Sequence, residues 1–270
     1  MERPPQATVA GPLVDTHCHL ADQAFDGDRE QVIARARAAH VTHCVLVADS
    51  LESAHACRRL ATQHQLSATA GVHPHVAHTW TSDTAAQLAA ALEDPAVVAV
   101  GETGLDYHYE HAPRAAQRSA FEAQLRLAAE HRRPVVVHAR DADEDLVSLL
   151  ADYGRAVPAL VLHSFSSGPA AFEAGLDAGA YFSFSGMITF RKWAHGHHVA
   201  QCPANRVLLE TDAPYLTPEP FRGTRNEPAY VQYVARQAAA LRGEAPEALA
   251  RLSTDNAVRC FGPRVRTSTT

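Results

Sequence analysis

The chain has 270 residues, of which 46% are hydrophobic and 20% charged, and its formal net charge at pH 7 is −6. This apolar fraction excludes a disordered chain, and a transmembrane helix is excluded because no run reaches about 18 apolar residues. The acidic balance argues against a protein that coats nucleic acid through bulk positive charge.

Eight short apolar runs are predicted to form buried strands. In chain order they are Leu13–Leu20, Thr42–Ala48, Ala68–His75, Val97–Asp106, Pro134–Arg140, Ala159–Ser166, Ala180–Gly186 and Val207–Tyr215. Seven of the runs are separated from the next by a segment long enough for a crossover helix. Such alternation is typical of a parallel sheet.

Five segments have the 3.6-residue period of an amphipathic helix. In the first of them, Val32, Ala36 and Ala39 fall on one face. The five segments are Asp28–His40, Pro113–Arg132, Asp141–Tyr153, Pro169–Ala178 and Pro228–Leu241. Several begin with Pro or Asp, which are common at helix starts.

Eight strand–helix units in a chain of this length predict an α/β fold, a single (β/α)8 TIM barrel. We expect this domain to span residues 9–263, with residues 1–8 and 264–270 as flexible tails. The alternative, an open doubly wound sheet, needs a glycine-rich loop after its first strand. The sequence there is His19-Leu20-Ala21 instead.

Polar residues interrupt several predicted strands near their C-terminal ends, where a buried parallel strand should be apolar. They are Asp15, His17, His19, Glu102, His138, His163, Glu210 and Asp212. In a barrel these ends converge on one rim, which is where catalytic groups lie.

His17 and His19 are two residues apart, so their side chains leave the same face of the strand, and Cys18 points the other way. Taken alone, this pair is as compatible with hydrogen-bonded core histidines as with metal ligands. Together with His138, His163, Glu102 and Asp212, it provides more ligands than one tetrahedral ion needs. Two cations bridged by Glu102 would use all six.

The sequence around these residues resembles the TatD family of metal-dependent deoxyribonucleases, which have an amidohydrolase-like barrel. The resemblance covers nearly the whole chain in order and lies in the segments Asp15–His19, Gly71–His75, Gly101–Tyr107, Val137–Arg140, His163–Ser166, Leu209–Tyr215, Arg225–Pro228 and Asn256–Gly262. Ser164 and Ser167 stand where the family often has Cys and Gly.

The resemblance implies a metal-dependent hydrolase that uses Mg or another divalent ion, and two ions are expected. Imidazole ligands suit Zn or Mn, whereas carboxylates and phosphate oxygens suit Mg. One ion would be held by His17, His19, Glu102 and Asp212, and the other by Glu102, His138 and His163. Glu102 and Asp212 are the expected catalytic residues, with Asp212 orienting or deprotonating the attacking water. Glu210 is expected to be a buried partner of a ligand histidine or an arginine.

Substrate contacts are expected at the same rim from His73, His108, Arg140 and Arg225. Arg191, Lys192 and Arg222 also follow strand ends, so the rim would carry local positive charge despite the acidic chain. His75 and His78 are expected in a loop. The trio His195, His197 and His198 is expected on a solvated surface.

The predicted function is hydrolysis of DNA phosphodiesters, with removal of nucleotides from an exposed end. The first alternative is a hydrolase of C–N or carboxylic ester bonds on the same barrel, such as a deaminase or deacylase. Many such enzymes bridge their metals with a modified lysine, whereas the fourth strand here offers Glu102. The second alternative, a binding module without catalysis, lacks the broad basic face that it needs.

We expect the protein to act in the cytoplasm on DNA single strands or ends, without a membrane and without an obligate protein partner. Its five cysteines are scattered, odd in number and never spaced as CxxC, which argues against disulfides and thiolate zinc sites. The first eleven residues lack the basic start and long apolar stretch of a secretory signal.

Overall fold

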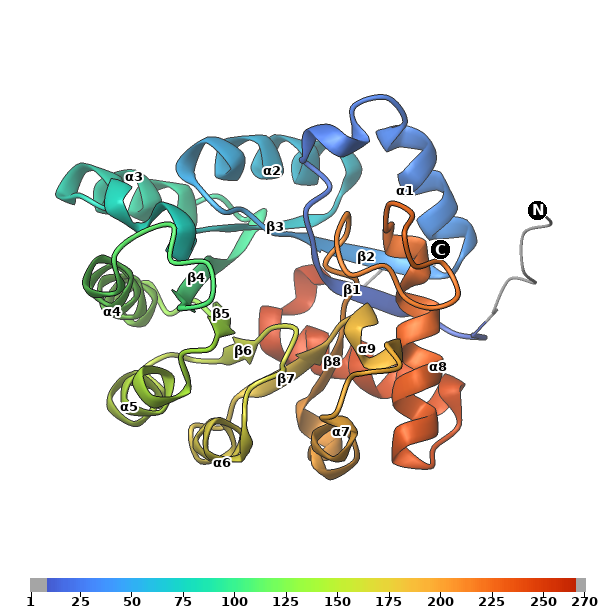
Figure 1. The fold of residues 1–270 in the computed structure, drawn as a ribbon. Helices are drawn as coiled ribbons and strands as arrows, with labels where there is room; N and C mark the ends of the chain where they lie inside the picture. Colours follow the sequence, from blue (N-terminus) through green and yellow to red (C-terminus); the bar gives the residue numbers. More distant parts are fainter. Residues whose placement is uncertain (1–8, 266–270) are drawn as a thin grey trace.

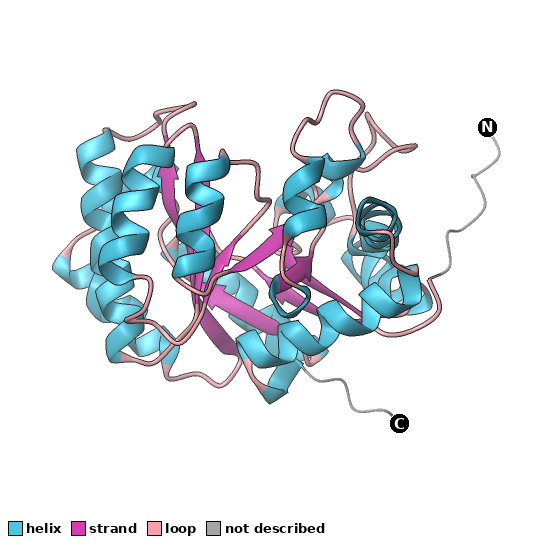
Figure 2. Cartoon of the chain, turned by 90° about the horizontal axis from the view of Figure 1, so that it is seen from below, coloured by secondary structure: helices cyan, strands magenta, loops and turns pink. Residues whose placement is uncertain are grey.

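A computed structural model describes residues 9–265. Eight parallel strands pair in sequence order, β1 with β2 and so on to β8, and helices surround them (Figures 1 and 2). The strands are β1 (Leu13–Cys18), β2 (Val41–Leu46), β3 (Ser67–Ala70), β4 (Val97–Asp106), β5 (Val135–Arg140), β6 (Leu160–Leu162), β7 (Tyr181–Phe184) and β8 (Val207–Leu209). The predicted TIM barrel is confirmed.

The helices follow the strands in regular alternation. They are α1 (Arg29–Ala38), α2 (Leu51–His64), α3 (Ser82–Leu92), α4 (Arg114–Glu130), α5 (Asp143–Tyr153), α6 (Pro169–Asp177), α7 (Gly196–Gln201), α8 (Val231–Arg242) and α9 (Pro246–Phe261). Of these, α2, α3, α7 and α9 were not among the five helices predicted from periodicity. In the part of the chain that the structure describes, no helix is long and apolar enough to cross a membrane.

Two apolar layers hold the barrel together. The outer layer lies between strands and helices and contains Leu13, Cys18 and Leu46, so Cys18 points into the wall as expected. The inner layer fills the barrel with one or two residues from nearly every strand and is joined by residues of α9. Its members include Val14, Val45, Val98, Val136, Val161, Leu208, Ala257 and Phe261. The interior of the barrel is therefore a packed, mainly apolar core.

The last turn that the structure describes belongs to this core. The predicted tail starts at residue 264, but Pro263–Val265 forms a 3₁₀ turn and Val265 is fully buried in the inner layer. The predicted tails at 1–8 and 266–270 lie outside the described residues.

Several strands are shorter than predicted at their C-terminal ends. β3, β6 and β8 stop before His73, His163 and Asp212, although the apolar runs continue beyond them. Ser164 and Asp212 have left-handed backbone angles, with φ of 42° and 58°. A strand cannot continue through such angles. His73, His163 and Asp212 therefore lie on loops that leave the barrel wall shortly after β3, β6 and β8.

Gly104 allows β4 and β5 to approach closely beside this rim. Its φ is +137°, and a Cβ at this position would lie 2.0 Å from the carbonyl oxygen of His138. Only glycine combines this angle with this contact. The close approach brings Glu102 on β4 and His138 on β5 to the same side of the barrel mouth.

The first and last strand–helix units are joined by four charged residues. The guanidinium of Arg225 donates to both carboxylate oxygens of Asp28 at 2.8 Å, and Arg35 bridges Asp28 to Glu227. Asp28 accepts hydrogen bonds from Arg225 and from Arg35. These bonds lower the pKa of Asp28 to about 2, although burial acts to raise it. The cluster fastens α1 to the segment that follows β8.

Arg225→Ala should lower the free energy of unfolding at pH 7 by about 1 kcal/mol, as expected for a partly exposed ion pair. Because the pKa of Asp28 is depressed in the folded protein, the contribution is present above the ordinary pKa near 4. It is lost as the pH falls toward 2. Urea unfolding of wild type and variant at several pH values checks this, with the exposed Arg191→Ala as control. A difference that does not shrink in acid would contradict it.

Candidate metal centre

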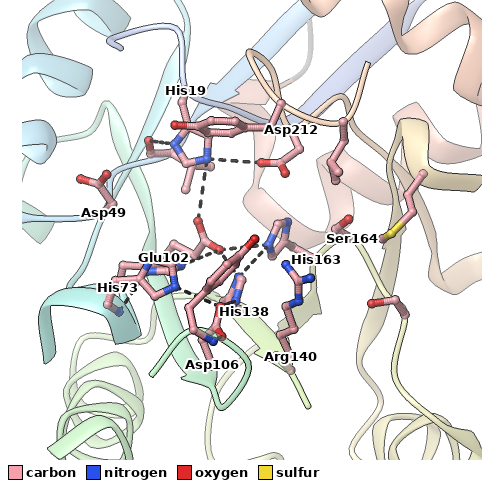
Figure 3. A pocket seen from close by; sticks show the side chains of 18 of the residues that line it. His19, Asp49, His73, Glu102, Asp106, His138, Arg140, His163, Ser164 and Asp212 are labelled. Atoms are coloured by element: carbon pink, nitrogen blue, oxygen red, sulfur yellow. Dashed lines mark hydrogen bonds and ion pairs between the residues drawn. The ribbon is translucent and has the colours of Figure 1, made fainter. Parts of the chain in front are cut away.

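A cavity of about 1540 Å³ opens at the C-terminal rim of the barrel. Residues from the ends of β1, β3, β4, β5, β6 and β8 line it, together with the loop after β7. Figure 3 shows His19, Glu102, His138, His163 and Asp212 pointing toward one another in this cavity. The structure thus brings together the polar strand-end residues that the sequence singled out.

The carboxylate of Glu102 lies at the centre and is almost completely buried. Its two oxygens face ring nitrogens from four strand ends. Oε1 lies 3.0 Å from His138 Nδ1, 3.0 Å from His163 Nε2 and 3.6 Å from His73 Nε2, and Oε2 lies 3.3 Å from His17 Nε2 and 3.9 Å from His19 Nε2.

His17, His19 and Asp212 form one side of the centre. The Nε2 atoms of His17 and His19 are 3.2 Å apart, and Asp212 Oδ1 is 3.6 Å from the first and 3.3 Å from the second. Around a tetrahedral ion with bonds of ~2.0 Å, ligand atoms lie about 3.3 Å apart. The spacing of these atoms therefore fits a cation.

Two groups of possible ligands share Glu102, the first with His17 and His19 and the second with His73 and His138. A third group combines His17, His163 and Asp212. In each, the ligand atoms lie within 4.8 Å of one another. His73, which the sequence placed among the substrate contacts, is thus as close to the centre as the expected ligands.

The histidines around Glu102 stabilise the ionised form of its carboxylate. Burial opposes ionisation of Glu102, but the charges of His163, His17 and His73 outweigh it and hold the pKa of this carboxylate well below its usual range. Burial likewise disfavours a charged His163, yet Glu102 and Glu210 raise its pKa well above the ordinary value. Divalent cations would likewise stabilise the ionised carboxylate of Glu102.

Two buried carboxylates are hydrogen-bonded to histidines of the centre. Glu210 Oε1 lies 3.1 Å from His163 Nδ1 and accepts the backbone N–H of Ser164 at 2.8 Å, as the sequence predicted for a partner of a ligand. Asp106 Oδ2 lies 3.0 Å from His138 Nε2 and 3.0 Å from His75 Nε2. Such partners fix the orientation and tautomer of a ligating ring.

Asp106 and His75 were not among the predicted site residues. Asp106 is the last residue of β4 and is fully buried. The rule that found Glu102, a polar residue near the end of an apolar strand, applies to it equally. His75 was expected only in a loop, because its contact with Asp106 depends on the course of the chain after β3.

The predicted substrate contacts separate into two sets. Arg140 and His73 line the cavity. His108 and Arg225 are not among its lining residues: Nδ1 of His108 lies 3.0 Å from Asp141 Oδ2, and Arg225 is held by Asp28. The donors of Arg225 expected to hold a phosphate are therefore engaged in the structural cluster.

The trio of histidines after β7 is not wholly on a solvated surface as predicted. His197 is exposed, but His198 is buried and its ring stacks on Phe172 with 4.7 Å between centroids. Burial lowers the pKa of His198 to about 4. It is an uncharged packing residue, and the three rings do not form a metal cluster in the described chain.

The chain is similar to known proteins along most of its length. A family described as TatD related DNase matches residues 14–262. The metal-dependent hydrolase YabD of Bacillus subtilis is 38% identical over 251 residues, covering 92% of this chain and 98% of YabD. The 3'-5' ssDNA/RNA exonuclease TatD of Dickeya dadantii is 38% identical over 262 residues, covering 94% and 99%.

A solved structure shows the same architecture. The crystal structure of YJJV, a TatD homolog from Escherichia coli K12, superimposes with a TM-score of 0.86 at 31% identity. The match covers 92% of this chain and 97% of that one.

Asp106→Asn should weaken the binding of Mn²⁺ roughly ten- to a hundredfold. This is the usual effect of removing a carboxylate that is hydrogen-bonded to a metal-binding histidine. The amide of Asn would donate to His138 Nε2 and drive the ring proton onto Nδ1, the nitrogen that faces Glu102. Titration calorimetry measures the change, with Asp141→Asn as control because Asp141 contacts the exposed His108. Equal affinities in wild type and Asp106→Asn would rule out this supporting role.

Proposed function

This chain belongs to the TatD-related DNase family of metal-dependent hydrolases, and we propose that it removes nucleotides from DNA ends with a binuclear centre. Relatives of 38% identity are named 3'-5' ssDNA/RNA exonucleases, and we propose the same direction and single-stranded substrates here. RNA is included among the proposed substrates on the same basis.

The position of Glu102 between two groups of ligands carries the proposal. Its Oε2 faces His17 and His19, whereas its Oε1 faces His138 and His163. A single carboxylate with one oxygen toward each group is suited to bridge two ions. We assign His17, His19 and Asp212 to one ion and His138 and His163 to the other. His73 borders the second.

Divalent ions in such a centre lower the pKa of water and neutralise an anionic phosphate. The residues of the chain then provide what phosphodiester hydrolysis still needs. Asp212 accepts the proton of the attacking water: burial opposes its ionisation, but the hydrogen bond with His19 and the charges of His17 and His163 lower its pKa. It is therefore ionised at neutral pH.

The substrate is held by groups around the same cavity. Arg140 is exposed, lines the cavity and forms no salt bridge with the described residues. We assign it to a substrate phosphate. His73 Nε2 points toward Glu102 Oε1 at 3.6 Å, and we assign His73 to the scissile phosphate.

Hydrolysis of a C–N or ester bond is the second candidate, because the same barrel could support it. Many hydrolases of that kind bridge their metals with a modified lysine. The only lysine of this chain, Lys192, lies in the loop after β7 and not on β4, which argues against that arrangement here.

We propose the cytoplasm as the compartment, because all five cysteines are free and buried.

A substrate panel tests the proposal. With Mg²⁺, Mn²⁺ or Zn²⁺ present, we expect the protein to shorten end-labelled single-stranded DNA from its 3' end and to bind two ions per chain. Asp212→Asn should lower kcat on the order of a hundredfold or more, because Asn keeps the shape of the side chain but cannot accept a proton. Its fold should persist.

The outcomes of this panel are distinct. Robust hydrolysis of amides or uncharged esters without cleavage of DNA or RNA would decide for the second candidate. One ion per chain would contradict the bridging role of Glu102. Near wild-type rates in Asp212→Asn would reassign the proton acceptor.

Arg140→Ala should raise KM for single-stranded DNA and flatten its dependence on salt by roughly 0.7 in the log–log slope, the value for one lost phosphate contact. The change in kcat should be smaller, because Arg140 positions the strand. Arg225→Ala serves for comparison: since Asp28 engages Arg225, its salt slope should equal that of wild type. An equal loss in both variants would return Arg225 to the substrate contacts.

A further inference from the structure

Two large hydrophobic side chains are strongly exposed within the described residues, and both line the same cavity. Tyr109 is 52% exposed and Tyr215 is 55% exposed, and each lines the cavity of the metal centre. Packing does not account for two exposed aromatic rings around one polar cavity. Exposed aromatic groups at a site are typical of ligand contacts.

The two tyrosines lie on opposite sides of Glu102. The ring of Tyr215 meets His19 with 5.9 Å between centroids, and its backbone N–H donates to the carbonyl of Asp212. The ring of Tyr109 lies 4.8 Å from the guanidinium of Arg140. Figure 3 shows His19 and Asp212 on one side of the centre and Arg140 with Asp106 on the other.

Neighbouring groups hold Tyr109 in place. Its backbone N–H donates to Asp106 Oδ1 at 2.9 Å. Its ring stacks on that of His111 with 5.7 Å between centroids, and meets His75 edge-on at 5.7 Å and His108 edge-on at 4.8 Å. Arg140 lies over the ring. A surface that accepts a flat guanidinium also accepts a flat base, and the long side chain of Arg140 can then reach a phosphate.

We propose that Tyr109 and Tyr215 are stacking positions for unpaired bases on the two sides of the scissile phosphate. This inference rests on the proposed function and explains how the enzyme selects single-stranded ends. In a duplex, neighbouring bases cover both faces of every base except the last, so two successive bases can place their faces on two protein rings only when they are unpaired. Stacking on aromatic rings tolerates every base, which suits an enzyme that removes nucleotides in succession.

The test compares Tyr109→Ala and Tyr215→Ala with the corresponding Phe variants. The substrates are a single-stranded oligonucleotide and the same oligonucleotide with abasic sites at its last two 3' positions. Each Ala variant should raise KM for the intact oligonucleotide roughly ten- to a hundredfold, the usual effect of losing one stacking ring. Each Phe variant should remain close to wild type, because the ring is kept.

The abasic substrate separates stacking from structural damage. The abasic substrate has no base to stack on either ring. Its KM should therefore be similar for wild type, Tyr109→Ala and Tyr215→Ala. Tyr153→Ala is the matched control, since Tyr153 lies on α5 outside the cavity and its hydroxyl accepts from Arg126. It should match wild type on both substrates.

Failure of this inference differs from failure of the proposed function. If wild type cleaves DNA but the Ala variants keep the same KM ratio on intact and abasic substrates, stacking is overturned and the nuclease stands. An effect confined to one tyrosine overturns the two-sided arrangement. If wild type cleaves neither DNA nor RNA, the proposed function itself fails, and the inference fails with it.

Discussion

The burial of one carboxylate among histidines is the constraint on which the rest of the site depends. Glu102 lies almost out of contact with solvent at the mouth of an apolar barrel. A buried anion is costly unless positive charge and hydrogen-bond donors surround it. The barrel meets this requirement by delivering imidazoles from several strand ends to one point, and it fixes His163 and His138 from behind with Glu210 and Asp106.

The fold was predictable because the barrel depends on local regularities. Apolar runs, amphipathic segments and their alternation reveal the number and order of strands. What those runs do not reveal is where a strand stops. At His163 and Asp212 the chain leaves the ladder while its sequence still looks like a strand, because the backbone angles that end it belong to single residues such as Ser164.

The site was predictable to the extent that its residues interrupt apolar strands. Asp106 obeys that rule and could have been included. Arg225 could not have been placed, because its partner Asp28 is 197 residues away in sequence. The exposure of Tyr109 and Tyr215 could not have been predicted either: an aromatic residue near a strand end is ordinary, and only the structure shows that both rings are exposed around one cavity.

The closure of the barrel has a consequence for the order of assembly during synthesis. β1 meets the segment after β8 through the bridge between Cys18 and Ala213, and the N–H of Asp212 donates to the carbonyl of His17 at 2.9 Å. A chain emerging from the ribosome therefore carries His17 and His19 long before Asp212 exists. Because domains fold as units, the complete set of side chains around Glu102 can come together only after β8 and the loop that follows it have been made. The arrangement of these side chains therefore depends on closure of the barrel.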